Sequence, residues 1–161
     1  MKKIIILSRV STEAQDLTSQ TKERISKAIQ LGYKDSKQQI VIENVESAIK
    51  LSENERIGIQ KLKHYIETDK DIDCVICWEP SRLSRQQKVL YSVRDYLVDH
   101  KIQLYILNPY MKLLTDDRTQ IDTTASIVFS LFSTLAENEM MIKKERFMRA
   151  KNELTKQGKK S

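Results

Sequence analysis

Ser11 is the residue of this chain that is best placed to do covalent chemistry. It follows an apolar, strand-like run, and Arg9 stands two positions before it. A serine hydroxyl is a poor nucleophile unless its surroundings stabilise the charge that develops during attack. The side chains that could do this come from distant stretches, and all are arginines: Arg56, Arg82, Arg85 and Arg146. Several guanidinium groups without an evident histidine base favour attack on a phosphate over attack on an amide.

The elements that must position these residues follow from the hydrophobic pattern. Apolar runs predict strands over residues 3–7, 39–45, 72–78 and 102–107. Helical patterns lie between them at 12–31, 57–66 and 87–100; Gly32 follows the first as its C′ residue, and Ser52 with Glu55 has capping-box spacing before the second. This alternation predicts an α/β fold with a central, mainly parallel sheet of four to five strands flanked by helices.

The last third of the chain predicts one long helix, over residues 119–157. Ile121, Ala125, Val128 and Phe132 continue an apolar stripe at helical spacing, and no Pro or Gly appears before Gly158. Such a helix is about 57 Å long, whereas a globule of this size has a radius of gyration of about 15 Å. We therefore expect it to protrude. Its inner half is apolar on more than one face, which predicts burial against a second subunit; packing within its own domain is the alternative.

The charge of the chain is concentrated at this end. The sequence holds 28 Lys and Arg and 22 Asp and Glu; eight of the former and two of the latter follow Ile142, so the first 142 residues carry 20 of each. A neutral body with a basic end predicts contact with a polyanion, or else a solvated helix tip. No apolar run is long enough for a membrane, which favours a cytoplasmic protein with no membrane partner.

Other site classes are disfavoured by composition and spacing. With only three glycines, the chain cannot build a Gly-rich phosphate loop, which disfavours a nucleotide-type phosphoryl-transfer or receiver-like domain. Cys74 and Cys77 fall within a predicted buried strand, where residues three apart face opposite sides of the sheet. They are predicted to be core thiols and not a metal or redox site.

Several motifs occur in an order that resembles the catalytic domain of the serine recombinases, which include resolvases, DNA invertases and transposon recombinases. The first is Arg9-Val10-Ser11-Thr12, with Gln15 and Gln20 after it. Next come Glu43 and Arg56, and then the second long motif, Ser81-Arg82-Leu83-Ser84-Arg85. The third long motif, on the predicted long helix, is Ala136-Glu137-Asn138-Glu139 with Glu145-Arg146. The resemblance covers nearly the whole chain.

The resemblance implies DNA strand exchange without a metal or other cofactor and without a small-molecule substrate. Ser11 would attack a backbone phosphate to form a 5′-phosphoserine linkage, and the chain would act as a homodimer that forms a tetramer on synapsis of two double-stranded DNA sites. Arg9, Arg82 and Arg85 would contact the phosphate, and Arg56 and Arg146 would complete the cluster. The supporting residues would be Gln15, Gln20, Glu43, Ser81 and Glu145, and the DNA-contacting ones Lys143, Lys144, Arg149 and Lys151.

The layout expected from the resemblance has three parts: a catalytic body over 1–118, a dimerisation and DNA-contacting helix over 119–157, and a basic tail or linker over 158–161. Relatives carry a DNA-reading module after the long helix, so we expect either a fragment or a protein without that module. Two departures leave an alternative open. Ser81 stands where many members have aspartate, and Met140 where arginine is common. The alternative is a catalytically weakened DNA-binding or interaction protein with the same fold.

Overall fold

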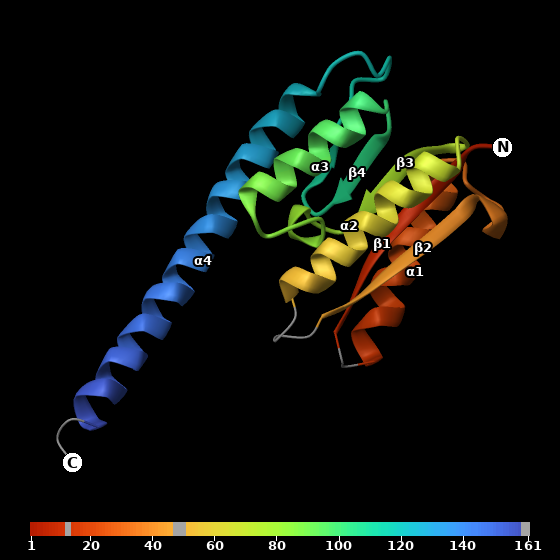
Figure 1. The fold of residues 1–161 in the computed structure, drawn as a ribbon. Coiled ribbons are helices and arrows are strands. Elements are labelled where there is room, and N and C mark those ends of the chain that lie inside the picture. Colours follow the sequence, from red (N-terminus) through yellow and green to blue (C-terminus); the bar gives the residue numbers. More distant parts are fainter. Residues whose placement is uncertain (12–13, 47–50, 159–161) are drawn as a thin grey trace.

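A five-stranded sheet forms the centre of the protein, as a computed structural model shows for residues 1–11, 14–46 and 51–158 (Figure 1). The strand order is β2-β1-β3-β4-β5; the first three pairs are parallel, and β5 runs antiparallel to β4. The predicted α/β fold is therefore confirmed, and the edge strand β5 is the one that the sequence pattern did not reveal. The strands are β1 (Lys3–Ser11), β2 (Gln39–Glu46), β3 (Ile72–Cys77), β4 (Gln103–Leu107) and β5 (Tyr110–Lys112).

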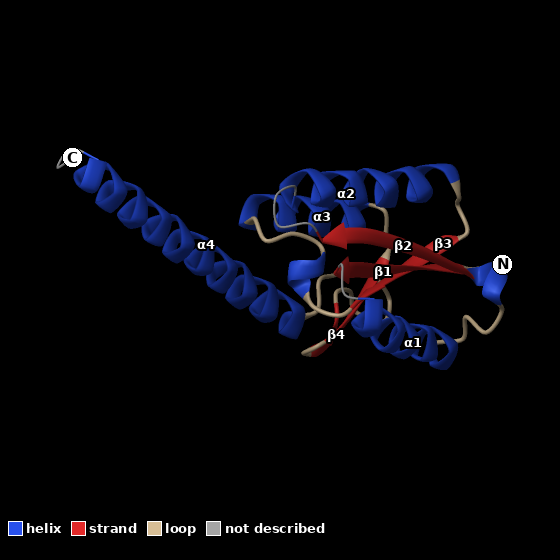
Figure 2. Cartoon of the chain, turned by 90° about the horizontal axis from the view of Figure 1, so that it is seen from below, coloured by secondary structure: helices blue, strands red, loops and turns tan. Residues whose placement is uncertain are grey.

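Helices cover both faces of the sheet. Figure 2 shows α1 on one side and α2 with α3 on the other, which gives three layers. Two short 3₁₀ turns, η1 (Ser36–Gln38) and η2 (Pro80–Arg82), precede β2 and follow β3. The helices are α1 (Ala14–Gln30), α2 (Leu51–Thr68), α3 (Gln87–Asp99) and α4 (Thr123–Gly158).

The core follows the two-residue period of the strands. On β1, Ile4 and Ile6 belong to the apolar cluster beneath α1, whereas Ile5 and Leu7 belong to the larger cluster on the other side. The two cysteines of β3 divide in the same way: Cys74 lies in the first cluster and Cys77 in the second, both buried as free thiols. Their predicted role as core thiols on opposite sides of the sheet is confirmed.

The ends of the helices test two predictions about capping. After α1, Gly32 has a φ of +104°, and its N–H donates to Ile29 O while the N–H of Tyr33 donates to Ala28 O, both at 3.0 Å. This is the Schellman pattern that Gly32 predicted. The capping box predicted before α2 is wrong, because the helix already begins at Leu51 and includes Ser52.

The long helix α4 begins four residues later than predicted, at Thr123. Asp122 is its cap: the carboxylate accepts hydrogen bonds from the N–H groups of Thr124 (3.0 Å) and Ala125 (3.4 Å). The preceding residues are held outside the helix, since Ile121 forms a bridge with Leu114 and the Thr119 hydroxyl donates to Asp117.

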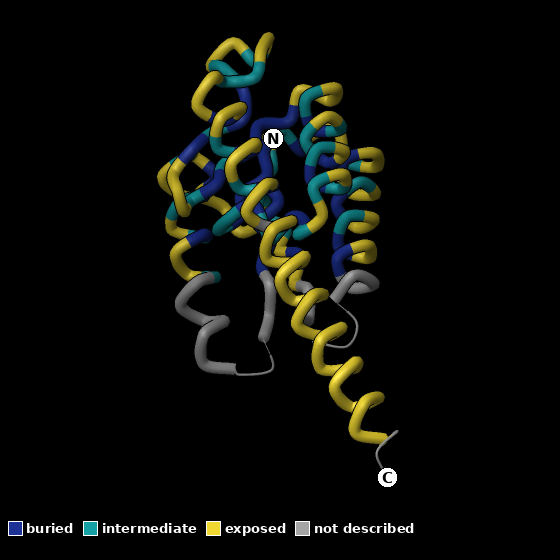
Figure 3. The backbone as a smooth tube through the Cα atoms, turned by 90° about the vertical axis from the view of Figure 1, so that its left-hand side faces the viewer, coloured by how far each residue is buried: buried dark blue, intermediate teal, exposed yellow. Residues whose placement is uncertain are grey.

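The predicted protrusion of α4 is confirmed. Its first turns pack on the body, where Ala125 and Phe129 are fully buried, but every residue from 137 to 158 is exposed (Figure 3). Leu131 and Leu135 remain 57% and 50% exposed, so burial against a second subunit stays a prediction. None of the described helices is both long enough and apolar enough to cross a bilayer.

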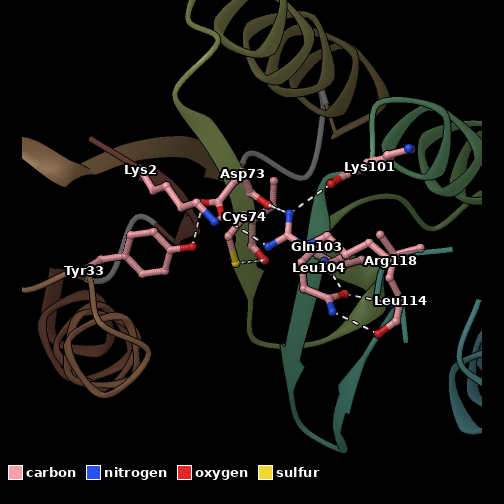
Figure 4. A network of polar contacts seen from close by, with 10 residues as sticks. Lys2, Tyr33, Asp73, Cys74, Lys101, Gln103, Leu104, Leu114 and Arg118 are labelled. Atoms are coloured by element: carbon pink, nitrogen blue, oxygen red, sulfur yellow. Dashed lines mark hydrogen bonds and ion pairs between the residues drawn. The ribbon is translucent and has the colours of Figure 1, made fainter. Parts of the chain in front are cut away.

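A polar network fixes the segment that leads into α4 (Figure 4). Arg118 donates one hydrogen bond to the Asp73 carboxylate (3.1 Å) and two to the carbonyls of Asp73 and Lys101 (2.9 and 3.0 Å). Tyr33 donates to the same carboxylate at 2.6 Å, and Lys2 lies 3.6 Å from it. Asp73 is at the amino-terminal end of β3, so this network stabilises the edge of the sheet opposite to Ser11.

Candidate active site at the carboxyl edge of the sheet

The carboxyl ends of three adjacent parallel strands bring the first two long motifs together. Ser11 is the last residue of β1 and is in register with Glu46 of β2. On its other side β1 pairs with β3, and η2, which carries Ser81 and Arg82, follows β3 directly and contacts β1. The side chains of Arg9 and Ser11, like those of Gln15 and Gln20 on α1, lie outside the described part of the structure.

Glu79 organises the turn that presents Arg82. The Ser81 hydroxyl donates to Glu79 Oε1 at 2.8 Å, and Arg82 Nε lies 3.5 Å from the same oxygen. Pro80 begins the turn, where its fixed φ is compatible with the 3₁₀ conformation. Glu79 thus supplies a negative charge beside Arg82 and accepts from Ser81 within the same turn.

A buried carboxylate, Glu55 of α2, lies near this turn. It is 8% exposed and accepts a hydrogen bond of 3.3 Å from Ser84, whose own oxygen accepts from the N–H of Gln86. Glu55 and Arg82 both line a small cavity beside Leu7 of β1. The sequence pattern did not reveal this buried position, because the Ser-x-x-Glu spacing predicted that Glu55 caps the helix. The sequence signal for Glu55 was its place next to Arg56, a predicted site residue.

A second residue that the sequence did not reveal is Arg24 of α1, which is fully buried. Its Nη1 donates to the Ser8 hydroxyl on β1 at 2.6 Å, and that hydroxyl lies 3.0 Å from the hydroxyl of Thr21. Burial is the main cause that lowers the pKa of Arg24, and the positive charge of Arg82 lowers it further. An arginine on an amphipathic helix normally reaches solvent, so the pattern alone gave no sign of it.

The remaining predicted residues of the body lie on η2 and its neighbouring elements. Arg85 follows η2 and is half-buried. Arg56 is exposed on α2, and Glu43 is exposed on β2, where it borders a groove of about 410 Å³ between β2 and α2. Among the described residues no cluster of His, Cys, Asp and Glu could hold a metal ion. Arg82 in η2 and Arg85 just after it bring two guanidinium groups to the turn that follows β3, which suits an oxyanion such as a phosphate.

Residues 4–160 of the chain match the family described as Resolvase, N terminal domain. The chain belongs to the resolvase family. Its fold is that of the family's catalytic domain, as found in site-specific recombinases. A comparison with curated proteins found no match.

Two solved structures are similar in fold to this resolvase-family domain. The N-terminal catalytic domain of TP901-1 integrase is 27% identical, with a TM-score of 0.57 over 88% of this chain and 98% of that one. A resolvase family site-specific recombinase from Streptococcus pneumoniae is 18% identical, with a TM-score of 0.54 over 97% of this chain and 99% of that one, and shows the same fold.

In this resolvase-family domain the third motif begins where α4 leaves the body and continues on its exposed half. Gln87, at the start of α3, donates to both carboxylate oxygens of Glu137 at 2.8 and 2.9 Å when its amide is oriented to do so. Arg146 is nine residues further on, about 14 Å along the helix axis. It lies on the exposed half of α4, as do all the other predicted residues there: Lys143, Lys144, Glu145, Arg149 and Lys151. Met140 is exposed as well.

Proposed function

We propose that this resolvase-family domain cuts and rejoins DNA, with Ser11 as the nucleophile. The observation that carries the proposal is the placement of Ser11 at the carboxyl end of β1, the strand that is contacted by the turn with Arg82 after β3. Attack forms a bond between Ser11 Oγ and phosphorus and breaks the bond between phosphorus and the 3′ oxygen. The serine proton is lost, the 3′ oxygen gains a proton, and a 5′-phosphoserine linkage remains. The reverse reaction rejoins the strand.

The arginines supply the stabilisation that this reaction needs. Negative charge develops on the phosphate oxygens in the transition state, so catalysis depends on positioning and on fixed positive groups. Arg82 is 18% exposed in its side chain and is held by Glu79, so it is both oriented and accessible. Arg9, Arg56 and Arg85 would act with it, and the supporting set would orient them: Gln15, Gln20, Glu43, Ser81 and Glu145. No metal or other cofactor takes part in the proposed reaction.

The protruding half of α4 would contact the DNA backbone. Lys143, Lys144, Arg149 and Lys151 are exposed there, and such contacts bind DNA without reading its bases. Arg146 would join the active site only when DNA is bound. Ile127, Leu131 and Leu135 form an exposed apolar stripe closer to the body, which supports a homodimer and, on synapsis, a tetramer.

The test uses the intact protein and a suicide DNA substrate that carries its recombination site and traps the cleaved strand. Wild-type protein should form a covalent adduct that peptide mapping assigns to Ser11, and Ser11→Ala should form none. Arg82→Ala should lower the rate of adduct formation about 10²–10³-fold, the loss expected for one oxyanion donor. Ser126→Ala, at an exposed serine of α4, should react like wild type.

The outcomes separate this function from the non-enzymatic alternative. If the wild type forms no adduct on its own site, or if Ser11→Ala forms as much as the wild type, the proposed reaction is refuted. Retention of every measurable DNA-dependent function by Ser11→Ala would favour a DNA-binding or interaction protein that keeps only the fold.

A further inference from the structure

The contact between Arg24 and Ser8 fixes a part of β1 that one neighbouring strand no longer supports. The pairing of β1 with β2 continues to Ser11, but its pairing with β3 ends at Ile6. Beyond that point β3 stops at Cys77 and the chain turns into η2. The last residues of β1 therefore lack backbone hydrogen bonds to β3, and the side-chain contacts around Ser8 lie in this stretch.

The Ser8 hydroxyl is held from α1 by two groups. Arg24 Nη1 donates to it at 2.6 Å, and the Thr21 hydroxyl lies 3.0 Å away. Ser8 is 3% exposed and Arg24 is fully buried, so solvent does not compete for this contact. A hydrogen bond from a charged donor in such surroundings is among the stronger ones that proteins form.

Burial of a guanidinium group is costly, and an apolar side chain could fill the same space at a lower cost. The presence of arginine therefore calls for a role other than packing. Its position offers one, because the guanidinium connects α1 to β1 only three residues before Ser11. It is also close enough to Arg82 for the positive charge of Arg82 to lower the pKa of Arg24 beyond the effect of burial. Arg24 thus lies close to three segments of the candidate active site: α1, which carries it, β1 and η2.

We propose that Arg24 is a positioning residue for the cleavage reaction, which fixes the end of β1 through its hydrogen bond to Ser8 and thereby places Ser11 relative to Arg82. This inference rests on the proposed function. It concerns the rate of attack and not the affinity for DNA, because Arg24 is buried and does not itself face the nucleic acid.

The experiment measures the single-turnover rate of adduct formation by the intact protein across a range of concentrations of the suicide DNA substrate. Arg24→Met keeps the length of the side chain without its charge, and Ser8→Ala removes the acceptor. Each should lower the rate at saturating DNA about tenfold, with the half-saturating DNA concentration unchanged. Arg24→Lys, which keeps a charged donor, should recover most of the rate. Thr21→Val, which removes only the other partner of Ser8, is the matched control and should react like wild type.

A double-mutant cycle gives the decisive comparison. If the contact itself acts, Arg24→Met combined with Ser8→Ala should be no slower than either variant alone. Three results would each overturn the inference: additive losses of rate in the double variant, a half-saturating DNA concentration that changes as much as the rate, or a wild-type rate in Ser8→Ala. Ser8→Ala decides alone if Arg24→Met does not fold. An inactive wild type would refute the proposed function, whereas an active wild type matched by Ser8→Ala refutes only the role of Arg24.

Discussion

Phe129 attaches the long helix to the body, and its truncation should cost about 3–5 kcal/mol of stability. The side chain is fully buried in the large apolar cluster, on the part of α4 that contacts α3 and β5. Loss of its burial accounts for about 1.5–3 kcal/mol, and the cavity left by Phe129→Ala adds the rest. Domains of this kind have a free energy of unfolding of about 5–15 kcal/mol, so the variant should stay folded but lose a large share of its stability.

Urea unfolding followed by circular dichroism measures this loss. With a slope of about 2 kcal/mol per molar urea, the midpoint should fall by roughly 2 M. Leu131→Ala is the matched control: it lies two residues away on the same helix and is 57% exposed, so it should change stability by less than about 0.5 kcal/mol in dilute solution. If Phe129→Ala costs no more than Leu131→Ala, the described packing of α4 on the body is wrong.

Three further predictions concern other parts of the molecule. Leu131→Ser with Leu135→Ser should weaken self-association of the intact protein at least tenfold in analytical ultracentrifugation, because both residues lie on the exposed apolar stripe; an unchanged association constant would exclude that stripe as the interface. Burial raises the pKa of both cysteine thiols, that of Cys77 to about 12. The stability that these protonated thiols contribute is thus complete below the unfolded-state pKa of about 8.5 and is lost as pH rises above it. Cys74→Ala with Cys77→Ala should therefore make the free energy of unfolding, measured by urea titration, fall less steeply at alkaline pH; an unchanged fall would contradict this prediction. Arg118 has a φ of +58°, so Arg118→Gly should be about 1 kcal/mol more stable than Arg118→Ala although both lose the contact with Asp73; equal midpoints would argue against that backbone conformation.

The elements of the fold could be predicted because local rules govern them. Apolar periodicity predicted β1 to β4 and the three helices of the body, although α2 begins six residues earlier than predicted and β5 was not predicted. Gly32 marked the end of α1 because glycine readily adopts the left-handed conformation found there. The errors arose where contacts distant in sequence decide. The start of α4 was misplaced because Ile121 pairs with Leu114, and the cap of α2 because Glu55 turns inward to Ser84.

The candidate site could be predicted only in its residue types. The motifs named Ser81 and Arg82, but the carboxylate that holds them, Glu79, precedes the motif and has no helical spacing to mark it. Arg24 could be predicted even less well than Glu79. Its spacing on the helix is compatible with solvent exposure, and the fold shows that it is buried against Ser8.

The sequence by itself determined the α/β alternation, the long basic C-terminal helix and the set of serine and arginine motifs, because side-chain chemistry and short-range periodicity are local properties. Only the tertiary structure decided that the ends of β1, β2 and β3 share one edge, that Arg24 lies buried there, and that Arg146 stands outside the body on the exposed half of α4. These features depend on which strands pair and on where packing ends, and no local pattern encodes either.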